Sequence, residues 1–169
     1  SGLRNGEPEN FFGPVVGGTP VDQSLTLTKL ASTSALGNVE VFVQGVTLTF
    51  HQVRVSLNGT VLGTLSFSGQ QRGKGSFQVP QTSLNEGFNT VQLVSLGGPS
   101  DISLVETVRI QYVHTLTADS NLLRPAAKAG QPLTIGGFTS PDVRVIDVTN
   151  AYEPRELTGA ISGPLSNSS

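Results

Sequence analysis

The sequence predicts an all-β fold, either a sandwich or a barrel. Apolar and polar residues alternate over much of the chain, as at Val39, Val41 and Val43, and this two-residue period is typical of half-buried strands. Turn residues interrupt the alternation at intervals of roughly 8 to 12 residues. No stretch keeps the 3.6-residue period of an amphipathic helix. Short strands joined by turns favour a sandwich or barrel over a parallel α/β sheet.

Composition narrows the classes of function. The chain has 169 residues, enough for one well-buried domain with or without an appendage, because domains cluster at about 100 to 150 residues. The formal net charge is only −2, which argues against a nucleic-acid partner. No run approaches the ~18 apolar residues of a membrane span. The chain contains no Met, so we expect it to be part of a longer precursor.

Catalytic chemistry finds little support in the sequence. The chain has no Cys, which excludes a thiolate nucleophile, a disulfide and a Cys-ligated zinc. The two histidines, His51 and His114, stand at predicted strand ends outside any recognisable motif, and we expect both to be partly exposed. Any two of the 12 carboxylates could meet in space, and the sequence does not select a pair. We therefore expect a protein that is not an enzyme.

In chain order, strands are expected around 25–27, across 39–43 and across 46–50. The next stretch, 51–67, reads as a hairpin with Asn58-Gly59 at its turn. A two-residue loop would split the apolar side chains between both faces, whereas a three-residue loop, with Gly59 left-handed in a bulge, pairs Val55 with Val61 and keeps them together. We predict the three-residue loop. The other face would then carry Arg54, Ser56, Leu62, Thr64 and Ser66.

The later strands differ in character. Residues 88–96 are apolar in both phases, as expected of a central strand that is covered on both faces. Residues 106–113 alternate, with Val108 on one side and Arg109 and Gln111 on the other, so one face of that strand should be wet. Most of the phenylalanines fall on apolar phases and are expected in the core.

Beyond His114 the periodicity weakens until 142–148, an expected strand whose Val143 and Val145 need a covering surface. The final residues have the composition of a linker. The predicted segments are a lead-in over 1–19, the β-sandwich over 20–114, a β extension toward a downstream domain over 115–160, and a linker or frayed tail over 161–169.

Metal-binding signals are sparse. No calcium-loop pattern is present, and only Asp101 and Glu106 lie near each other in a turn-rich stretch. Strand alternation places Glu106 in phase with the apolar Val108, where a carboxylate needs a partner. A rim position or an ion pair explains Glu106 as well as a ligand role does. No metal is assigned and no cofactor is expected, with a structural calcium ion left open through these two weak candidates.

Part of the chain carries a family resemblance. A strand ending in an "NG" turn is followed by an L-x-x-G-x-N-x-x-x-L stretch, formed by Leu84, Gly87, Asn89 and Leu93, and the closing strand ends at Tyr112. This pattern, over residues 20 to 114, resembles the galactose-binding-like jelly-roll modules. The resemblance implies a jelly-roll β-sandwich.

A second resemblance concerns the flanks. The run from His114 to Leu157, above all "FTSPDVRVIDVTN", and "ENFFGPVV" near the start are similar to the region before the catalytic domain in gingipain-like (family C25) secreted cysteine peptidases of bacteria. The resemblance implies an extracellular or cell-surface protein with a downstream peptidase domain as partner. The catalytic Cys and His of that family lie in the peptidase domain, and no position of this chain matches them.

Two functions are therefore expected. The first is a non-catalytic module of a secreted cysteine-peptidase precursor, acting as pro-region, folding support or substrate-positioning domain. The alternative is a carbohydrate-binding module, weakened by the absence of Trp. In that case polar side chains on a sheet face would contact the glycan, with Arg54, Arg109 and Gln111 as candidates.

Overall fold

The structure is a computed structural model that describes residues 12–128 and 130–158. The chain divides into two compact units, 1–113 and 114–169, and each is described by itself. The expected tail, 161–169, and residues 1–11 of the expected lead-in lie outside the described residues.

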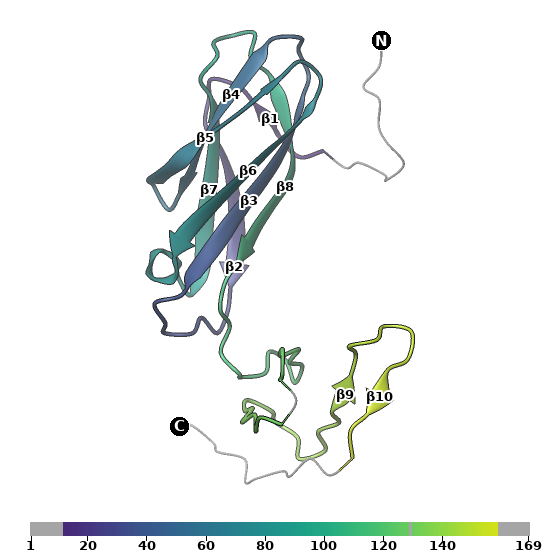
Figure 1. Cartoon of the computed structure of the whole chain (residues 1–169). Coiled ribbons are helices and arrows are strands. Elements are labelled where there is room, and N and C mark those ends of the chain that lie inside the picture. The colour runs from purple at the N-terminus through teal and green to yellow at the C-terminus, as the bar shows by residue number, and fades with distance from the viewer. Residues whose placement is uncertain (1–11, 129, 159–169) are drawn as a thin grey trace. The chain divides into compact units, whose positions relative to one another are not determined.

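The described part of unit 1, residues 12–113, contains eight strands and one short 3₁₀ helix. Their bounds are β1 (Val15–Val16), β2 (Val21–Leu27), β3 (Leu36–Gly45), β4 (Phe50–Leu57), β5 (Thr60–Ser68), β6 (Arg72–Pro80), η1 (Gln81–Ser83), β7 (Gly87–Ser95) and β8 (Ser103–Gln111). The strands form two four-stranded antiparallel sheets, in the orders β1-β8-β3-β6 and β2-β7-β4-β5 (Figure 1). Apart from the β4–β5 hairpin, consecutive strands lie in opposite sheets. This order is that of an eight-stranded jelly roll, and the predicted fold class is confirmed.

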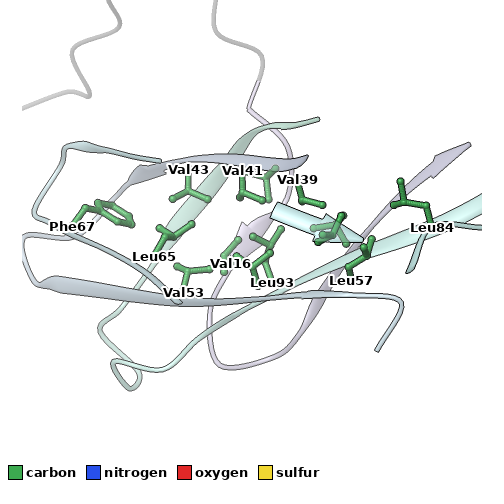
Figure 2. Packing of buried hydrophobic residues seen from close by; sticks show 14 of the residues in the cluster. Val16, Val39, Val41, Val43, Val53, Leu57, Leu65, Phe67, Leu84 and Leu93 are labelled. Atoms are coloured by element: carbon green, nitrogen blue, oxygen red, sulfur yellow. The ribbon is translucent and has the colours of Figure 1, made fainter. Parts of the chain in front are cut away.

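The core lies between the inner faces of the two sheets. Val39, Val41 and Val43 of β3 face Val53 and Leu65 of the other sheet, and all five are buried. Figure 2 shows Phe67 at one end of the labelled residues and Leu84 at the other. β1 lies within the expected lead-in, yet its Val16 is part of this core. The two-residue period of the sequence therefore identifies the inward-facing positions correctly.

The β4–β5 hairpin corrects the predicted loop. Its loop is Asn58-Gly59, closed by the Leu57–Thr60 pair, and both loop residues have positive φ, 48° and 84°. These angles are those of a type I′ turn. The extra residue lies instead in β5, because the register shifts between Val55, which pairs with Gly63, and Ser56, which pairs with Val61. The bulge keeps Val53, Val55, Leu65 and Phe67 together on the inner face, as predicted.

The bulge also exchanges two neighbouring side chains relative to the prediction. Leu62 packs against the core, whereas Val61 is 57% exposed on the outer face. The predicted pairing of Val55 with Val61 is therefore wrong. The alternation of apolar residues shows that the hairpin contains one extra residue. It does not show whether this residue lies in the loop or in a strand, because both positions give the same alternation further along the strand.

A second bulge, in β8, changes the position of Glu106. Phe42 pairs with Thr107 and the adjacent Val43 pairs with Val105, so Glu106 is the extra residue. Its carboxylate binds Arg72 of β6, whose guanidinium lies over the outward-facing Phe42. The expectation that Glu106 shares the face of Val108 is thus wrong, and the alternative of an ion pair is what the structure shows.

The L-x-x-G-x-N motif forms the entry to β7. Gly87 has a φ of 89°, a left-handed conformation that glycine adopts at little cost. The Asn89 side chain is buried, and it accepts hydrogen bonds from the Asn85 amide and the Asn58 side chain, at 2.9 Å each. Leu84 and Leu93 belong to the core. The motif residues are therefore structural.

Unit 2 has little regular structure in its described part. Its strands are β9 (Ile146–Asp147) and β10 (Arg155–Glu156), which pair as a short antiparallel ladder. Within the expected strand at 142–148, only Ile146 and Asp147 form a strand. Val143 and Val145 are half-buried, while Val148 is exposed.

Candidate functional site

The two outer sheet faces carry the predicted binding residues. Arg54 of β4 lies on the outer face of sheet β2-β7-β4-β5, which we call the Arg54 face. Arg109 and Gln111 of β8 lie on the outer face of sheet β1-β8-β3-β6, the Arg109 face. These residues alternate along their strands with the buried residues that form the core. The structure therefore does not bring the three candidates into one site.

The Arg109 face has an aromatic ring at its centre, but cations cover it. Phe42 is only 8% exposed. The Arg72 guanidinium lies 4.2 Å from the ring centroid, the Lys74 ammonium 5.2 Å and the Arg109 guanidinium 5.9 Å. Such cation–π contacts hold the charged groups against the ring. The ring is therefore not available for stacking against a ligand.

Two of these cations are also paired with carboxylates. Both Arg72–Glu106 hydrogen bonds measure 2.6 Å, and Lys74 lies 3.1 Å from Glu40. The hydrogen bonds from Arg72 to Glu106 raise the pKa of Arg72. The bidentate geometry fixes the orientation of both groups. The charges of Arg72 and Lys74 are therefore balanced by carboxylates of the same face.

The Arg54 face differs because it presents bare aromatic rings. Phe88 of β7 is 78% exposed and Phe50 of β4 is 55% exposed. Both alternate with buried residues of their strands and point outward. The expectation that most phenylalanines lie in the core is wrong for these two. Phe88 follows the phase of Thr90 and Gln92 rather than that of Val91, and this phase is the signal that could have identified it.

The cross-strand register places the two rings at opposite ends of the face. Arg54 pairs with Val94, which lies six residues along β7 from Phe88, and Phe50 lies four residues along β4 on the far side of Arg54. At about 3.3 Å per residue the two ends are roughly 30 Å apart. The face is long enough for an extended ligand.

Polar groups fill the space between the rings. Gln92 of β7 donates a hydrogen bond of 2.9 Å to Asp22 of β2, and Thr90 pairs with Ser24. Gln52 lies exposed on β4 and pairs with Ser66. Amide, hydroxyl and carboxylate groups thus form rows across the strands, and these rows contain both hydrogen-bond donors and hydrogen-bond acceptors.

Arg54 lies near the middle of the Arg54 face, between its two phenylalanine rings. Its cross-strand neighbours are Val94 and Thr64, and neither is charged. Val94 is only 7% exposed, so neighbouring side chains cover it. Among the residues that the structure describes, no carboxylate forms an ion pair with Arg54. Its guanidinium donors face solvent and are available to a ligand.

The loops at the Phe50 end of unit 1 enclose a buried polar pair. His51 Nδ1 lies 2.6 Å from Asp101 Oδ1, and both side chains are fully buried. The other ring nitrogen of His51 lies 3.2 Å from the Thr47 carbonyl oxygen and 3.0 Å from that of Gly69. The expectation of a partly exposed strand-end histidine is therefore wrong for His51. Sequence reasoning missed this pair because its members are 50 residues apart.

The Asp101 carboxylate accepts further hydrogen bonds. The backbone amides of Gln52 and Gly97 each donate to Oδ2 at 3.0 Å. Burial alone raises the pKa of Asp101, but the nearby Ser95 hydroxyl and the donors at Gln52, His51 and Gly97 outweigh it and lower the pKa overall. The Ser95 hydroxyl acts from close by without forming a hydrogen bond in the structure. Asp101 is held as a carboxylate.

The two weak metal candidates do not meet. The Asp101 oxygens accept the bonds just described, inside the sandwich, whereas both Glu106 oxygens accept from Arg72 on the Arg109 face. Within residues 12–128 and 130–158, no group of three or more His, Asp or Glu side chains could hold a metal ion. A calcium site is therefore not assembled from these residues.

Unit 2 has a second histidine–aspartate pair. His114 Nε2 lies 2.7 Å from Asp119 Oδ2, and both side chains are partly exposed. The prediction of a partly exposed histidine is met at this position. Both ring nitrogens of His51 face carboxylate or carbonyl oxygens and not a hydroxyl group, so the His51–Asp101 pair does not have the arrangement of a catalytic triad.

Comparisons with known proteins were made on sequence and on structure. No protein-family model matches the chain, and no curated protein matches it. Solved structures that resemble it include the CBM36-1 domain of a multidomain xylanase from the hindgut metagenome of Trinervitermes trinervoides. The identity is 12%, the match covers 64% of this chain and 90% of that chain, and the TM-score is 0.45.

Two further solved structures are similar. A family 35 carbohydrate binding module from an environmental isolate is 16% identical over 64% of this chain and 96% of that chain, with a TM-score of 0.42. The carbohydrate-binding module CBM36 in complex with calcium and xylotriose is 13% identical over 57% of this chain and 78% of that chain, with a TM-score of 0.40. At this level, the likenesses assign neither a family nor a ligand to the chain. None of these findings supports a gingipain-like origin.

Proposed function

We propose that this chain is a non-catalytic module that binds an extended carbohydrate on the Arg54 face. The observation that carries the proposal is the pair of bare phenylalanine rings, Phe88 and Phe50, at opposite ends of one polar sheet face. The proposal rests on this surface and not on the solved structures, whose TM-scores lie below 0.5.

A sugar ring has one face of C–H groups and an edge of hydroxyl groups, and the Arg54 face offers partners for both. Phenylalanine presents a flat apolar surface for the C–H face. Gln92, Thr90, Gln52 and Arg54 present hydrogen-bond donors and acceptors for the hydroxyl groups. Binding sites for small polar ligands commonly combine aromatic surface with a few placed polar groups.

The backbone under the face is already ordered. Phe88 stands between Gly87, with its left-handed backbone, and Asn89, whose buried side chain bonds the entry to β7. Because the sheet already fixes the Cα positions of these residues, little main-chain entropy is lost on binding. An exposed, preformed and elongated surface suits a polysaccharide chain better than an isolated small sugar.

Titration with soluble polysaccharides tests the proposal. Arabinoxylan, glucomannan, mixed-linkage β-glucan and pectin would be titrated into the full chain by isothermal calorimetry and by affinity electrophoresis. We expect Phe88→Ala to weaken binding at least about tenfold, the loss of ~1.4 kcal/mol, because the stacking surface is removed. Tyr152→Ala is the matched control, since Tyr152 is 96% exposed and lies in unit 2.

Equal losses in both variants, or unchanged binding in Phe88→Ala, would show that the Arg54 face is not the site. Extracellular or cell-surface location fits a polysaccharide ligand and stays a prediction. In the described part of the chain, no helix is long and apolar enough to cross a membrane.

The role next to a peptidase domain is a second candidate, and one observation favours it. Several apolar side chains of unit 2 are poorly buried. Each of four is about half exposed or more: Leu122, Ile146, Val148 and Leu157. Such apolar residues suit a docking surface. Adding the chain to an active family C25 peptidase domain, with peptide hydrolysis as readout, tests this candidate, and unchanged hydrolysis and no complex on gel filtration would contradict it.

A further inference from the structure

We infer that His51 and Asp101 act as positioning residues that hold the Phe50 end of the Arg54 face, and that they do so only while both nitrogens of the His51 ring carry hydrogen. This inference rests on the proposed function, since it names how the binding face is regulated. Neither residue touches the ligand.

The first step concerns the contacts of the ring. Nδ1 of His51 faces the Asp101 carboxylate at 2.6 Å, and Nε2 faces the carbonyl oxygens of Thr47 and Gly69 at 3.2 and 3.0 Å. All three partners are hydrogen-bond acceptors. A neutral imidazole has one N–H and one lone pair, so it cannot donate on both sides. Because Asp101 is held as a carboxylate, only the doubly protonated ring satisfies every contact.

The second step concerns what else faces the ring. Phe67 of β5 stacks on it with ring centroids 4.5 Å apart, and Gly45 at the end of β3 packs so closely that an added Cβ would lie 2.9 Å from Nε2. Asp101 is the charged group in contact with His51 among the described residues. Both side chains are fully buried, so a charged group in the solvent cannot take the place of Asp101 as the partner of His51. Buried charges are stable when they are paired and hydrogen-bonded.

The third step connects the pair to the binding face. Asp101 Oδ2 accepts from the Gln52 amide in β4 and from the Gly97 amide beyond β7, and the Leu96 amide donates to the Gln52 carbonyl at 2.8 Å. The pair therefore joins the start of β4 to the end of β7. Phe50 and Gln52 flank His51 in sequence and point to the opposite side, onto the Arg54 face.

Loss of the Nε2 proton would turn a lone pair toward two carbonyl oxygens. The repulsion would loosen the turns at Thr47 and Gly69 and disturb the backbone at Phe50, which pairs with Ser68 next to Gly69. We therefore expect polysaccharide affinity to fall as the pH is raised over the range in which the chain stays folded, because the ring then loses this proton. Contacts at the distant Phe88 end should persist.

Asp101→Asn separates this mechanism from a simple packing role. The asparagine amide can donate to Nδ1 while its oxygen still accepts from Gln52 and Gly97, so the neutral ring with hydrogen on Nε2 satisfies every contact. The affinity of this variant should not change with pH over the same range. Asp119→Asn is the matched control, because it alters the second histidine–aspartate pair, in unit 2.

The test combines two readouts on the full chain. ¹⁵N NMR of the His51 ring, recorded in a His114→Gln background over the pH range in which the chain stays folded, should show both nitrogens protonated in the acidic part of that range. Titration of arabinoxylan and glucomannan over the same range should show wild-type affinity falling about tenfold with rising pH, and constant affinity in Asp101→Asn.

A ring with one N–H at every pH, or identical pH profiles for the wild type and Asp101→Asn, would overturn the inference. If neither polysaccharide binds at any pH, the proposed function fails for these ligands, and the ring spectra still decide the protonation state. The two failures are thus distinguishable.

Discussion

At the scale of single residues, environment decides what each polar or aromatic side chain does. Phe42 and Phe88 both point outward from a sheet, yet Phe42 is covered by three cations and Phe88 is bare. Alternation along the strand predicts the outward direction of both. It does not predict the cover, because the covering Arg72 and Lys74 come from another strand. His51 is similar, since its partner Asp101 lies far away in the sequence.

Acid should destabilise unit 1 through Asp101. The folded state lowers the pKa of this carboxyl below its ordinary value of 3.8, so its stabilising effect is complete above that value and is lost as the pH falls through the lower folded-state pKa. Chemical denaturation at a series of acidic pH values should show a falling free energy of unfolding. The fall should be smaller in Asp101→Asn, and an equal fall in both proteins would contradict this role of the carboxylate.

At the scale of elements, local rules predict strands well and predict their exact pairing less well. The predicted central position of β7 between β2 and β4 is confirmed. The expectation that β7 is covered on both faces is wrong, because its outward-facing Phe88 is 78% exposed. The bulges in β5 and β8 do not follow from the apolar pattern, although they determine which face receives Val61, Leu62 and Glu106. A bulge is selected by contacts on both sides of a strand, and a single strand's sequence does not contain them.

The type I′ turn between β4 and β5 provides a test at this scale. Gly59→Ala should destabilise the protein by about 1–2 kcal/mol, because Gly59 has a φ of 84° and a Cβ is unfavourable there. Gly18→Ala is the control, since Gly18 also has open space around it but lacks a positive φ. Urea denaturation measures both. A loss in Gly18→Ala as large as that in Gly59→Ala would contradict the turn assignment.

At the scale of the whole molecule, the two units differ in how much apolar surface they bury. Unit 1 has a continuous core from Val16 to Val105, whereas in the described part of unit 2 only Ala118 is a buried apolar residue. The weaker alternation of apolar and polar residues after His114 agrees with this difference. Stability of a segment follows its buried contacts, so local opening should occur more readily in unit 2.

Limited proteolysis of the full chain should show this difference directly. We expect a broad-specificity protease to cleave first within 114–158, and to leave a resistant fragment that contains β1 to β8. Mass spectrometry of the time course identifies the cleavage sites. First cuts within the strands of unit 1, or loss of both units at the same rate, would show that the units are not independent in stability.

The central claim is that the Arg54 face binds an extended carbohydrate. Amide chemical-shift mapping of the full chain, with oligosaccharides prepared from the tightest-binding polysaccharide, tests it most directly. The account predicts shifts at Phe88, Thr90, Gln92, Arg54 and Gln52, in rows that follow β7 and β4. Shifts confined to the Arg109 face or to unit 2 would contradict it, and so would an unchanged spectrum at saturating polysaccharide.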